Sequence, residues 1–316
     1  MKPALRIASF IVVSALGARA LAQEEICTGC KVDEALAKEA DAALVTTPTN
    51  EEITGDGYAP FGLPIGPAAT APYETLLYQR TFVESYDEEL KIPIWVAYKL
   101  AAADVTASLP RKDCFRTDPR VAGPAEATCD DYEEPIFDRG HVVPSADMKR
   151  TRTDQLNTFL FTNMAPQYPN FNRRVWEDLE GRVREWAISR GEIYVISGAV
   201  FDRNGDAKRD SDYDVQWMST KVAVPTHFYK IIMAQKPDGT LDSITVLLTH
   251  DDDPAYANKQ FREQTITQGI CCIGEIEKVT GVSFLPGLPE GAERELVLSH
   301  IAKPSEWTTR GSSPRE

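Results

Sequence analysis

The stretch between residues 138 and 187 limits the fold of this chain more than any other part of the sequence. The run Thr-Phe-Leu-Phe-Thr-Asn at 158–163 is short, apolar and bounded by polar residues, which predicts a strand. Residues 172–187 place apolar side chains three and four positions apart, the spacing of an amphipathic helix. We therefore expect the strand at 158–163 and the helix at 172–187 to belong to a series of strand, loop, strand and helix in the middle of the chain.

Further strands and helices are predicted on both sides of this stretch. β-Branched and aromatic residues predict strands at 76–83, 92–97, 192–201 and 220–233, and a short helix is expected at 273–280, where Gly281 ends it. No internal repeat or second domain boundary interrupts the pattern, and one large domain accommodates a chain of this length. We expect an α+β fold with a single domain at 58–300 and a C-terminal tail at 301–316.

The first 22 residues have the order of segments that an export signal has. Lys2 and Arg6 precede an apolar stretch at 7–17, which is shorter than the ~20 residues needed to cross a bilayer. Ala20-Leu-Ala22 places small residues at the positions that a signal peptidase reads. A buried N-terminal helix is the alternative, but it does not require this order. We expect cleavage after Ala22, no membrane anchor, and a secreted or periplasmic protein.

The chain is acidic, with 34 Lys and Arg against 48 Asp and Glu and a net charge of −14. A nucleic-acid partner usually meets a basic surface, so this charge argues against one. The charge is uneven, however, because nine acidic residues and two lysines fall within 23–57, whereas 138–185 is nearly neutral and rich in arginine. We interpret 23–57 as an acidic leader, which is a disordered tail, an autoinhibitory arm or a solubility device. Net charge alone therefore does not exclude a nucleic-acid substrate.

Six cysteines in an exported chain make disulfide bonds expected. Six cysteines allow 15 pairings, and the spacing favours two local ones, Cys114 with Cys129 and Cys27 with Cys30. The Cys27-Thr-Gly-Cys30 spacing also suits a redox or zinc site, but it has no second cysteine pair and no nearby histidine. The adjacent cysteines at 271–272 cannot bond to each other without strain, and their partners stay open.

The tetrapeptide Asp138-Arg-Gly-His141 combines groups that suit phosphodiester hydrolysis. A neutral imidazole accepts a proton from water near neutral pH, and a guanidinium holds phosphate oxygens as a bidentate pair. The glycine between them allows a close approach of the main chain. His141 and Arg139 are therefore candidate catalytic residues, although a single histidine is as often a structural residue.

Asn172 and Glu180 are candidate metal ligands downstream of the tetrapeptide. They are eight residues apart, about two helical turns, so their side chains share roughly one face of the expected helix. An amide oxygen with a more distant carboxylate suits Mg²⁺, with Mn²⁺ as a substitute, because Mg²⁺ prefers oxygen ligands and keeps several waters. The alternatives are a helix N-cap for Asn172 and a solvated helix surface for Glu180.

Taken together, these segments resemble a known family. The run Asp138-Arg-Gly-His-Val-Val-Pro-Ser-Ala-Asp-Met148, the Asn-Met-Ala-Pro-Gln run at 163–167 and the Asn-x₃-Trp-x₂-Leu-Glu run at 172–180 resemble the DNA/RNA non-specific endonucleases. These are the ββα-metal nucleases, which include endonuclease G and secreted bacterial enzymes, and the resemblance covers about 58–289. It implies a ββα-metal nuclease fold with a central, mostly antiparallel sheet flanked by helices.

The resemblance implies a role for each residue of these motifs. His141 would be the general base that deprotonates the attacking water, and Arg139 would contact the phosphate. Asn172 would be the direct protein ligand of a Mg²⁺ ion, and Glu180 would hold metal-bound waters. The implied reaction is attack of water on phosphorus in line with the leaving 3′ oxygen, which gives 5′-phosphate ends.

Two further residues are assigned through the same resemblance. Asn163 would support the site or bind substrate, and Arg111, four residues before Phe115, would bind phosphate. The expected substrates are DNA and RNA, and a homodimer is compatible with the sequence. Two other functions stay open: a catalytically silent protein that binds nucleic acid or calcium, and a phosphodiesterase for a non-nucleic substrate.

Residues 202–214 alternate oxygen-bearing side chains as a calcium loop does. The run Asp202-Arg-Asn-Gly-Asp-Ala-Lys-Arg-Asp210 is followed by Asp212 and Asp214, but it lacks the bidentate glutamate at the twelfth position of an EF-hand. The loop is either a calcium site or a solvated acidic turn. A calcium-dependent shift in the melting temperature would support the first interpretation.

Overall fold

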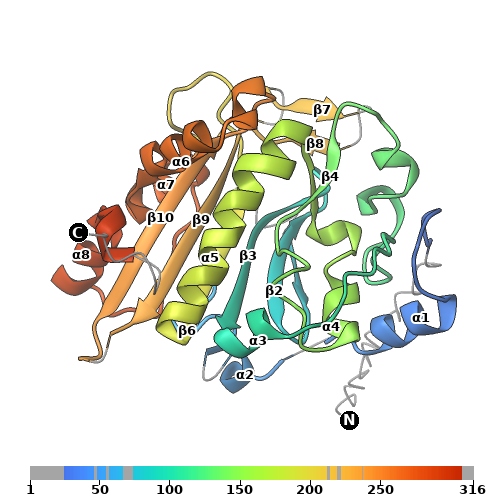
Figure 1. The fold of residues 1–316 in the computed structure, drawn as a ribbon, viewed down its shortest axis with the longest axis horizontal. Helices are drawn as coiled ribbons and strands as arrows, with labels where there is room; N and C mark the ends of the chain where they lie inside the picture. Colours follow the sequence, from blue (N-terminus) through green and yellow to red (C-terminus); the bar gives the residue numbers. More distant parts are fainter. Residues whose placement is uncertain are drawn as a thin grey trace, which may run out of the picture.

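Figure 1 shows the computed structural model of the protein, which describes residues 25–45, 48–54, 57–66, 74–211, 214–218, 222–236 and 238–307. The export signal expected at 1–22 lies outside these residues. Among the described residues, no helix combines the length and the apolar character needed to cross a membrane.

A seven-stranded sheet forms the centre of the molecule, with the strand order β1-β2-β3-β6-β9-β10-β11 (Figure 1). Every neighbouring pair in it is antiparallel. Its strands are β1 (Glu74–Tyr78), β2 (Phe82–Asp87), β3 (Ile92–Ala101), β6 (Glu192–Val200), β9 (His227–Gln235), β10 (Leu241–Thr249) and β11 (Ile270–Cys271). Two ribbons of two strands each lie beside the sheet: β4 (Asp138–His141) with β5 (Met164–Gln167), and β7 (Gln216–Met218) with β8 (Val222–Val224).

Helices flank this sheet, so the expected α+β class is confirmed. The long helix α5 crosses the sheet over β3 and β6, while α6 and α8 pack against β10 (Figure 1). The short helix expected near 273–280 is present, and Gly281 ends it in the left-handed conformation with a φ of 71°. The helices are α1 (Glu34–Ala42), α2 (Asn50–Thr54), α3 (Ala102–Thr106), α4 (Arg152–Asn157), α5 (Glu177–Arg190), α6 (Lys259–Gln268), α7 (Ile273–Thr280) and α8 (Ala292–Ser299).

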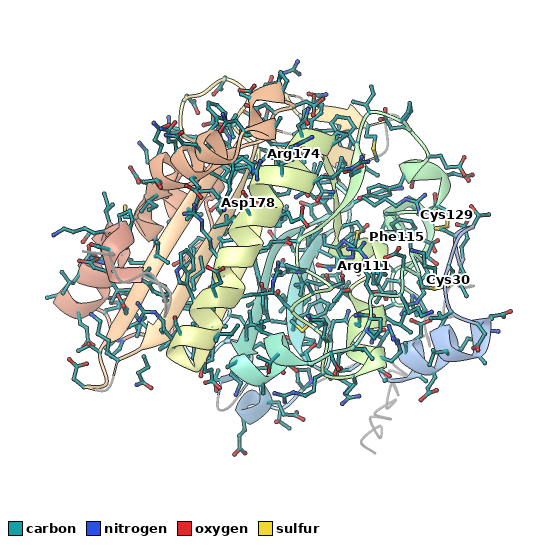
Figure 2. All side chains as sticks on the ribbon, viewed as in Figure 1. Cys30, Arg111, Phe115, Cys129, Arg174 and Asp178 are labelled. Atoms are coloured by element: carbon teal, nitrogen blue, oxygen red, sulfur yellow. A yellow bond between two sulfur atoms is a disulfide. The ribbon has the colours of Figure 1, made fainter. Side chains whose placement is uncertain are left out.

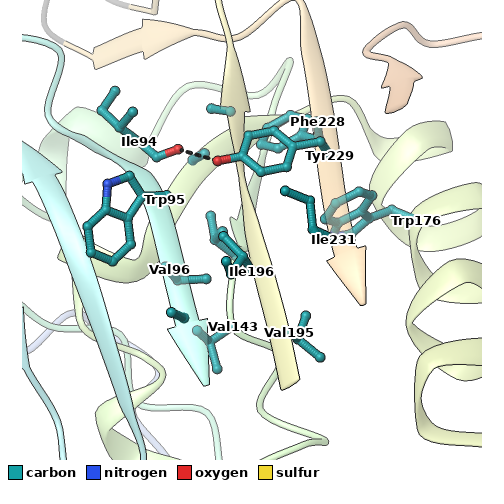
Figure 3. Close-up of a cluster of buried hydrophobic side chains, with 14 of the residues drawn as sticks. Ile94, Trp95, Val96, Val143, Trp176, Val195, Ile196, Phe228, Tyr229 and Ile231 are labelled. Atoms are coloured by element: carbon teal, nitrogen blue, oxygen red, sulfur yellow. Dashed lines mark hydrogen bonds between the residues drawn. The ribbon is translucent and has the colours of Figure 1, made fainter. Parts of the chain in front are cut away.

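The core lies where the central strands meet α5. Strands β3, β6 and β9 are buried along nearly their whole length, because both faces of the sheet are covered and their sequences are almost continuously apolar. Figure 3 shows Trp95, Ile196 and Phe228 from the three strands in this cluster with Trp176 from the start of the long helix. The sheet therefore holds the helix start in a fixed place, and the candidate site lies beside it.

The prediction of a strand at 158–163 is wrong. The chain there forms a 3₁₀ turn, Phe161–Asn163, and the strand follows as β5, which pairs antiparallel with β4 so that His141 faces Met164. The Asn163 amide fixes the turn because it bonds the main chain of Val143 on both sides, accepting from N–H and donating to C=O. Pro166 is tolerated in β5 because a two-stranded ribbon leaves one edge of each strand without ladder bonds.

The helix expected at 172–187 is confirmed and has an unusual first part. Residues Phe171–Trp176 form a π-helical turn that runs directly into α5. Asn170, and not Asn172, occupies the N-cap position. The interpretation of Asn172 as a helix cap is therefore wrong, and its side chain is available to the site.

The local disulfides expected for Cys114 with Cys129 and for Cys27 with Cys30 are wrong. The structure joins Cys27 to Cys129 and Cys30 to Cys114, across sequence separations of 102 and 84 residues. The leader lies alongside the segment near Phe115, where Ile26 bridges to Arg116 and the Cys27 N–H bonds the Phe115 carbonyl. This pairing brings each leader cysteine to a cysteine of the body. Closing loops of ~100 residues stabilises the fold by about 4–5 kcal/mol per bond in the chain-entropy model.

The described part of the acidic leader is a packed element of the domain. Ala37 and Ala40 of α1 are fully buried, and Asp41 forms an ion pair of 2.7 Å with the fully buried Arg116. The Asn157 amide adds a hydrogen bond to the Ala40 carbonyl. The interpretation as a disordered tail is therefore wrong for these residues, and the 23–57 boundary does not separate them from the body.

The domain also continues beyond residue 300. Trp307 is buried, and its ring packs edge-on against Trp186 of α5 with a centroid distance of 5.4 Å. The Trp186 indole N–H donates to the Trp307 carbonyl, and the Arg190 guanidinium lies 3.8 Å from the centre of the Trp307 ring. Residues 301–307, which were expected as a tail, therefore belong to the folded body.

Candidate active site

A cleft of about 570 Å³ lies beside β4 and the start of α5, and it gathers most of the predicted site residues. Arg111, Arg139, His141, Asn172 and Glu180 all line it. They come from a loop, a strand and a helix that are far apart in the sequence. Figure 2 shows Arg111 close to Phe115, a second residue of the cleft wall. No residue of the acidic leader that the structure describes lines the cleft, so none of them acts there as an autoinhibitory arm.

His141 stands at the end of β4 with its ring held between aromatic side chains. The ring packs edge-on against Phe159 at 4.8 Å and lies 5.8 Å from the Phe115 ring, and the residue is only 8% exposed. Burial, and then the positive charge of Arg111, lowers the pKa of His141 to about 3. Its Nε2 is buried with no hydrogen-bond partner in the described structure. The imidazole is therefore neutral at physiological pH and can accept a proton.

Gly140 is needed for the ribbon that carries His141. A Cβ at this position would lie 2.3 Å from the side chain of Gln167 on the facing strand. The Gln167 side chain occupies the space that a side chain at position 140 would need. Glycine therefore allows β4 and β5 to pair closely.

Asn172 is oriented by Asp138, the first residue of the tetrapeptide. The Asn172 Nδ2 donates to Asp138 Oδ2 at 2.9 Å, and Arg173 holds both oxygens of the same carboxylate. Because a carboxylate only accepts hydrogen bonds here, the nitrogen of the amide must face Asp138. The Asn172 Oδ1 is left without a hydrogen bond to any described residue, and it is the atom that a cation would bind. The sequence pattern did not assign this orienting role to Asp138.

Glu180 lies two turns further along and has a buried lysine near it. Burial raises the pKa of Glu180 to about 7, and the nearby Lys230 ammonium counteracts this rise. Lys230 is fully buried on β9, where its Nζ donates to Ser197 Oγ at 3.2 Å and lies 4.4 Å from the Trp176 ring centre. Lys230 belongs to no motif of the sequence, where its only signal is one lysine within an apolar strand.

Arginines make the cleft attractive to an anion. Arg111, Arg139, Arg173 and Arg184 line it, against the carboxylates of Asp138, Glu177 and Glu180. Three of these arginines pair with carboxylates: Arg111 with Asp113, Arg173 with Asp138 and Arg184 with Asp147. Arg139 has no ion pair with the described residues, and it is half-buried over the rings of Phe115 and Phe161 at 5.0 and 5.9 Å. It is therefore the arginine best placed to bind phosphate.

Asn163 does not line the cleft. It is fully buried, and its amide bonds the main chain of Val143 and the carbonyl of Thr158. The assignment of Asn163 as a substrate-binding residue is therefore not supported by its position. Its contacts hold the chain two residues after His141, which is a supporting role.

His250 fixes the chain that leads from β5 to the long helix. Its Nε2 accepts a hydrogen bond from the Tyr168 N–H at 2.8 Å, and its Nδ1 donates to the Pro225 carbonyl at 2.7 Å. Both nitrogens are used, so the neutral form with the proton on Nδ1 is the one that fits. The sequence around His250 gives no sign of this role, because its partners are 25 and 82 residues away.

His250→Gln should flatten the pH dependence of the free energy of unfolding between pH 6.5 and about 4. Burial lowers the pKa of His250 to about 4, from 6.5. The unfolded state therefore binds more protons in this window, and the wild type loses stability as the pH falls. Glutamine keeps a donor and an acceptor but does not titrate, so the slope should decrease by up to about 1.4 kcal/mol per pH unit. Urea unfolding at several pH values measures this slope, and an unchanged slope would contradict the buried neutral imidazole.

The donor set of the cleft fits a divalent cation that keeps most of its waters. The described residues contain no group of three or more His, Cys, Asp or Glu side chains arranged to hold a metal. What the cleft offers is the unbonded amide oxygen of Asn172 and the Glu180 carboxylate, whose raised pKa a nearby cation would lower. Oxygen ligands in small number suit Mg²⁺.

Comparisons with known proteins give consistent results. A sequence model described as DNA/RNA non-specific endonuclease matches residues 68–291. The mitochondrial nuclease EXOG of Danio rerio is 32% identical over 72% of this chain. The aligned part covers 64% of that protein's length. A nuclease of Nostoc sp. is 31% identical over 69% of this chain and 76% of its own length.

A solved structure has the same fold. A chain in the crystal structure of the EndoG/EndoGI complex aligns with a TM-score of 0.63 and 23% identity, over 78% of this chain and 95% of its own. This likeness, together with the antiparallel sheet flanked by helices, confirms the expected architecture. The segment 68–291 that matches the family is well over half of the chain and contains every residue that lines the cleft. The chain therefore belongs to the DNA/RNA non-specific endonuclease family.

Proposed function

We propose that this protein is a Mg²⁺-dependent endonuclease that hydrolyses DNA and RNA with little sequence preference and leaves 5′-phosphate ends. The observation that carries the proposal is that three groups line one cleft: a neutral histidine, an arginine without an ion pair to the described residues, and an amide oxygen without a hydrogen bond to them. These are a proton acceptor, a phosphate-binding group and a cation ligand. The relatives named as nucleases support the same class of reaction.

His141 accepts the proton of the attacking water. Its ring is held by Phe159 and Phe115, so the direction in which it accepts is fixed. A pKa of about 3 makes the free imidazole a weak base, but the negative charge of a phosphodiester in the cleft favours the protonated ring and raises this value. A general base placed in this way contributes about 10²–10⁴-fold to the rate.

Arg139 holds the phosphate that is cleaved. Its guanidinium lies against two aromatic rings and has no carboxylate partner among the described residues, so it can bind the anion without breaking an ion pair. Arg111 lies at the same cleft but is exposed and paired with Asp113. We expect it to bind a neighbouring phosphate of the strand. Both arginines would bind phosphates and not base edges. Phosphate contacts carry no sequence information, which agrees with little sequence preference.

Asn172 and Glu180 would hold the Mg²⁺ ion. The hydrogen bond from the Asn172 Nδ2 to Asp138 orients the amide so that its oxygen faces away from Asp138. The buried Lys230 ammonium favours the charged form of Glu180. When bound, the ion would supply several kcal/mol of charge stabilisation to the phosphate and to the leaving 3′ oxygen.

Export from the cytoplasm is part of the same proposal. Two disulfides join the leader to the body, and such bonds persist in oxidising compartments. The order of segments at 1–22 adds an export signal. The protein would therefore act on nucleic acid in the periplasm or the medium.

The cleavage of three substrates tests the proposed activity. Supercoiled plasmid, single-stranded DNA and RNA should all be cut with Mg²⁺ and none with EDTA. A polynucleotide kinase should add a labelled phosphate to the 5′ ends of the products only after a phosphatase has removed their 5′-phosphates. Binding without cleavage would indicate a silent nucleic-acid-binding protein. Cleavage of a small phosphodiester but of none of the three polymers would indicate the non-nucleic phosphodiesterase.

A further inference from the structure

The loop that follows β6 has a geometry that the catalytic site does not use. It runs from Asp202 to Asp210, and none of its residues lines the cleft. We propose that Asp202–Asp210 is a calcium-binding site, separate from the catalytic metal and with a structural role. Residues 212–213 of the expected loop lie outside the described structure. Asp214 is exposed and accepts from the Ser211 hydroxyl, so it is not part of the proposed site.

The spacing of oxygen-bearing residues in this loop is that of the first nine positions of an EF-hand. Asp202, Asn204, Asp206 and Asp210 occupy positions 1, 3, 5 and 9, and Lys208 at position 7 would contribute its main-chain carbonyl. All of these ligands are oxygens and none is histidine or cysteine. This set is typical of Ca²⁺ and does not suit Zn²⁺.

The path of the main chain agrees with this numbering. An EF-hand turns sharply at position 6, where glycine is the usual residue. Position 6 is Ala207 here, and it has a φ of 60°, one of few non-glycine residues with a positive φ in the described structure. Gly205 at position 4 has a φ of 72°. The loop therefore keeps a left-handed turn at the expected position even though an alanine must adopt it.

Two buried carboxylate oxygens in the loop have no hydrogen-bond partner among the residues that the structure describes, and this is the observation that points to a cation. Asp210 is 7% exposed; its Oδ2 accepts from the Arg203 N–H, while its Oδ1 is buried with no hydrogen bond. Asp202 repeats the pattern, because its Oδ2 accepts from the Ala207 N–H and its Oδ1 is buried and unbonded. A buried charged oxygen without a partner is costly. One cation bound between the two carboxylates would satisfy both.

The remaining ligands set the expected affinity. Asn204 and Asp206 are exposed and each accepts from a main-chain N–H two residues further on, so their side chains already face the loop's own main chain. Asp202, Asp206 and Asp210 are not gathered into a finished metal site in this structure, and the sequence lacks the bidentate twelfth ligand. We therefore expect a modest dissociation constant, about 10⁻⁴–10⁻³ M, as in the weaker class of such loops.

A cation here would stabilise the end of the central sheet. The Asp210 N–H bonds the Phe201 carbonyl just after β6, and the Asp202 N–H bonds the hydroxyl of Thr226 just before β9. The Thr226 carbonyl in turn accepts from the N–H of His250, the residue that holds the chain before the long helix. Calcium should therefore act on the stability of the fold and not on the chemistry in the cleft.

Thermal unfolding with calcium tests this site. The full exported chain is melted with a fixed millimolar concentration of Mg²⁺, so that the catalytic site is supplied, and CaCl₂ is then added. We expect the Tm of the wild type to rise by about 5 °C once calcium exceeds its Kd a hundredfold. Asp210→Asn removes one buried charge and should abolish the rise, whereas Glu290→Gln, an exposed residue remote from this loop, should keep it.

Two further variants keep the test decisive if Asp210→Asn folds poorly. Asp206→Ala changes an exposed ligand and should weaken calcium binding at least tenfold by titration calorimetry. Ala207→Gly keeps every oxygen ligand and relaxes the turn, so it should retain the full rise in Tm. The proposal is overturned if the wild type shows no rise beyond Mg²⁺ alone, or if Asp206→Ala and Asp210→Asn rise as much as the wild type.

Discussion

Replacing His141 by alanine should lower the rate of plasmid cleavage by about 10²–10⁴-fold while the protein stays folded. The substitution removes the proposed acceptor of the water proton, and it leaves Arg139 and Asn172, the proposed phosphate and cation ligands, in place in the cleft. The fold should persist because the buried His141 Nε2 has no hydrogen-bond partner in the described structure, and the ring packs against Phe159 and Phe115, which both remain. Gel assays of initial rates and the Tm of both proteins measure the two effects.

A matched control separates this effect from the loss of any histidine. His300 lies near the end of α8 and does not line the cleft, so His300→Ala should cleave plasmid at the wild-type rate. Near-normal cleavage by the His141 variant would refute its role as general base.

Replacing Asn172 by alanine should raise the Mg²⁺ concentration needed for half-maximal cleavage by at least about tenfold. The amide oxygen that faces away from Asp138 is lost, so Glu180 alone remains of the two proposed ligands. The maximal rate should also fall, because an ion held by fewer ligands is less well placed to stabilise the transition state. Initial rates across a Mg²⁺ titration, fitted for the half-saturating concentration, measure both quantities.

Asn258→Ala is the control for this variant. Asn258 caps α6, where its Oδ1 accepts from the Phe261 N–H, and it does not line the cleft. We expect it to lower the stability by about 1 kcal/mol, as the loss of an N-cap does, and to leave the Mg²⁺ titration unchanged. A Mg²⁺ titration of Asn172→Ala that coincides with the wild type would contradict the ligand role.

Short spacings in the sequence predicted that most of the candidate site residues lie together in one cleft. His141 and Arg139 stand in one tetrapeptide, and Asn172 and Glu180 stand on one helix with the spacing of two turns. Such short spacings survive folding because a strand or a helix fixes the directions of its own side chains. The helix at 172–187 was found for the same reason, since its buried face repeats every three to four residues.

The strand in the middle is misplaced because the apolar run at 158–163 has the pattern of a strand. The structure has a turn there, because the buried Asn163 amide ties it to Val143, and the strand follows at β5, where the ribbon needs no N–H from Pro166. Neither contact can be seen in the sequence, since each depends on where the facing strand lies.

Contacts between distant segments account for the other differences. The disulfides join residues about 100 positions apart, so a preference for near neighbours chose the wrong pairs. Lys230 and His250 act on Glu180 and on Tyr168 only because the sheet brings β9 and the end of β10 beneath the long helix. A single lysine or histidine in an apolar stretch gives no sign of such a partner.

Chemical rescue tests the central claim most directly, namely that the His141 side chain accepts the proton of the attacking water. His141→Gly opens space beside the cleft, and imidazole added to the Mg²⁺-containing buffer can enter it. We predict that imidazole restores plasmid cleavage to this variant in a concentration-dependent way and does not restore it to Asn172→Ala, whose base is intact. No restoration in a folded His141→Gly protein, or equal restoration in both variants, would contradict the claim.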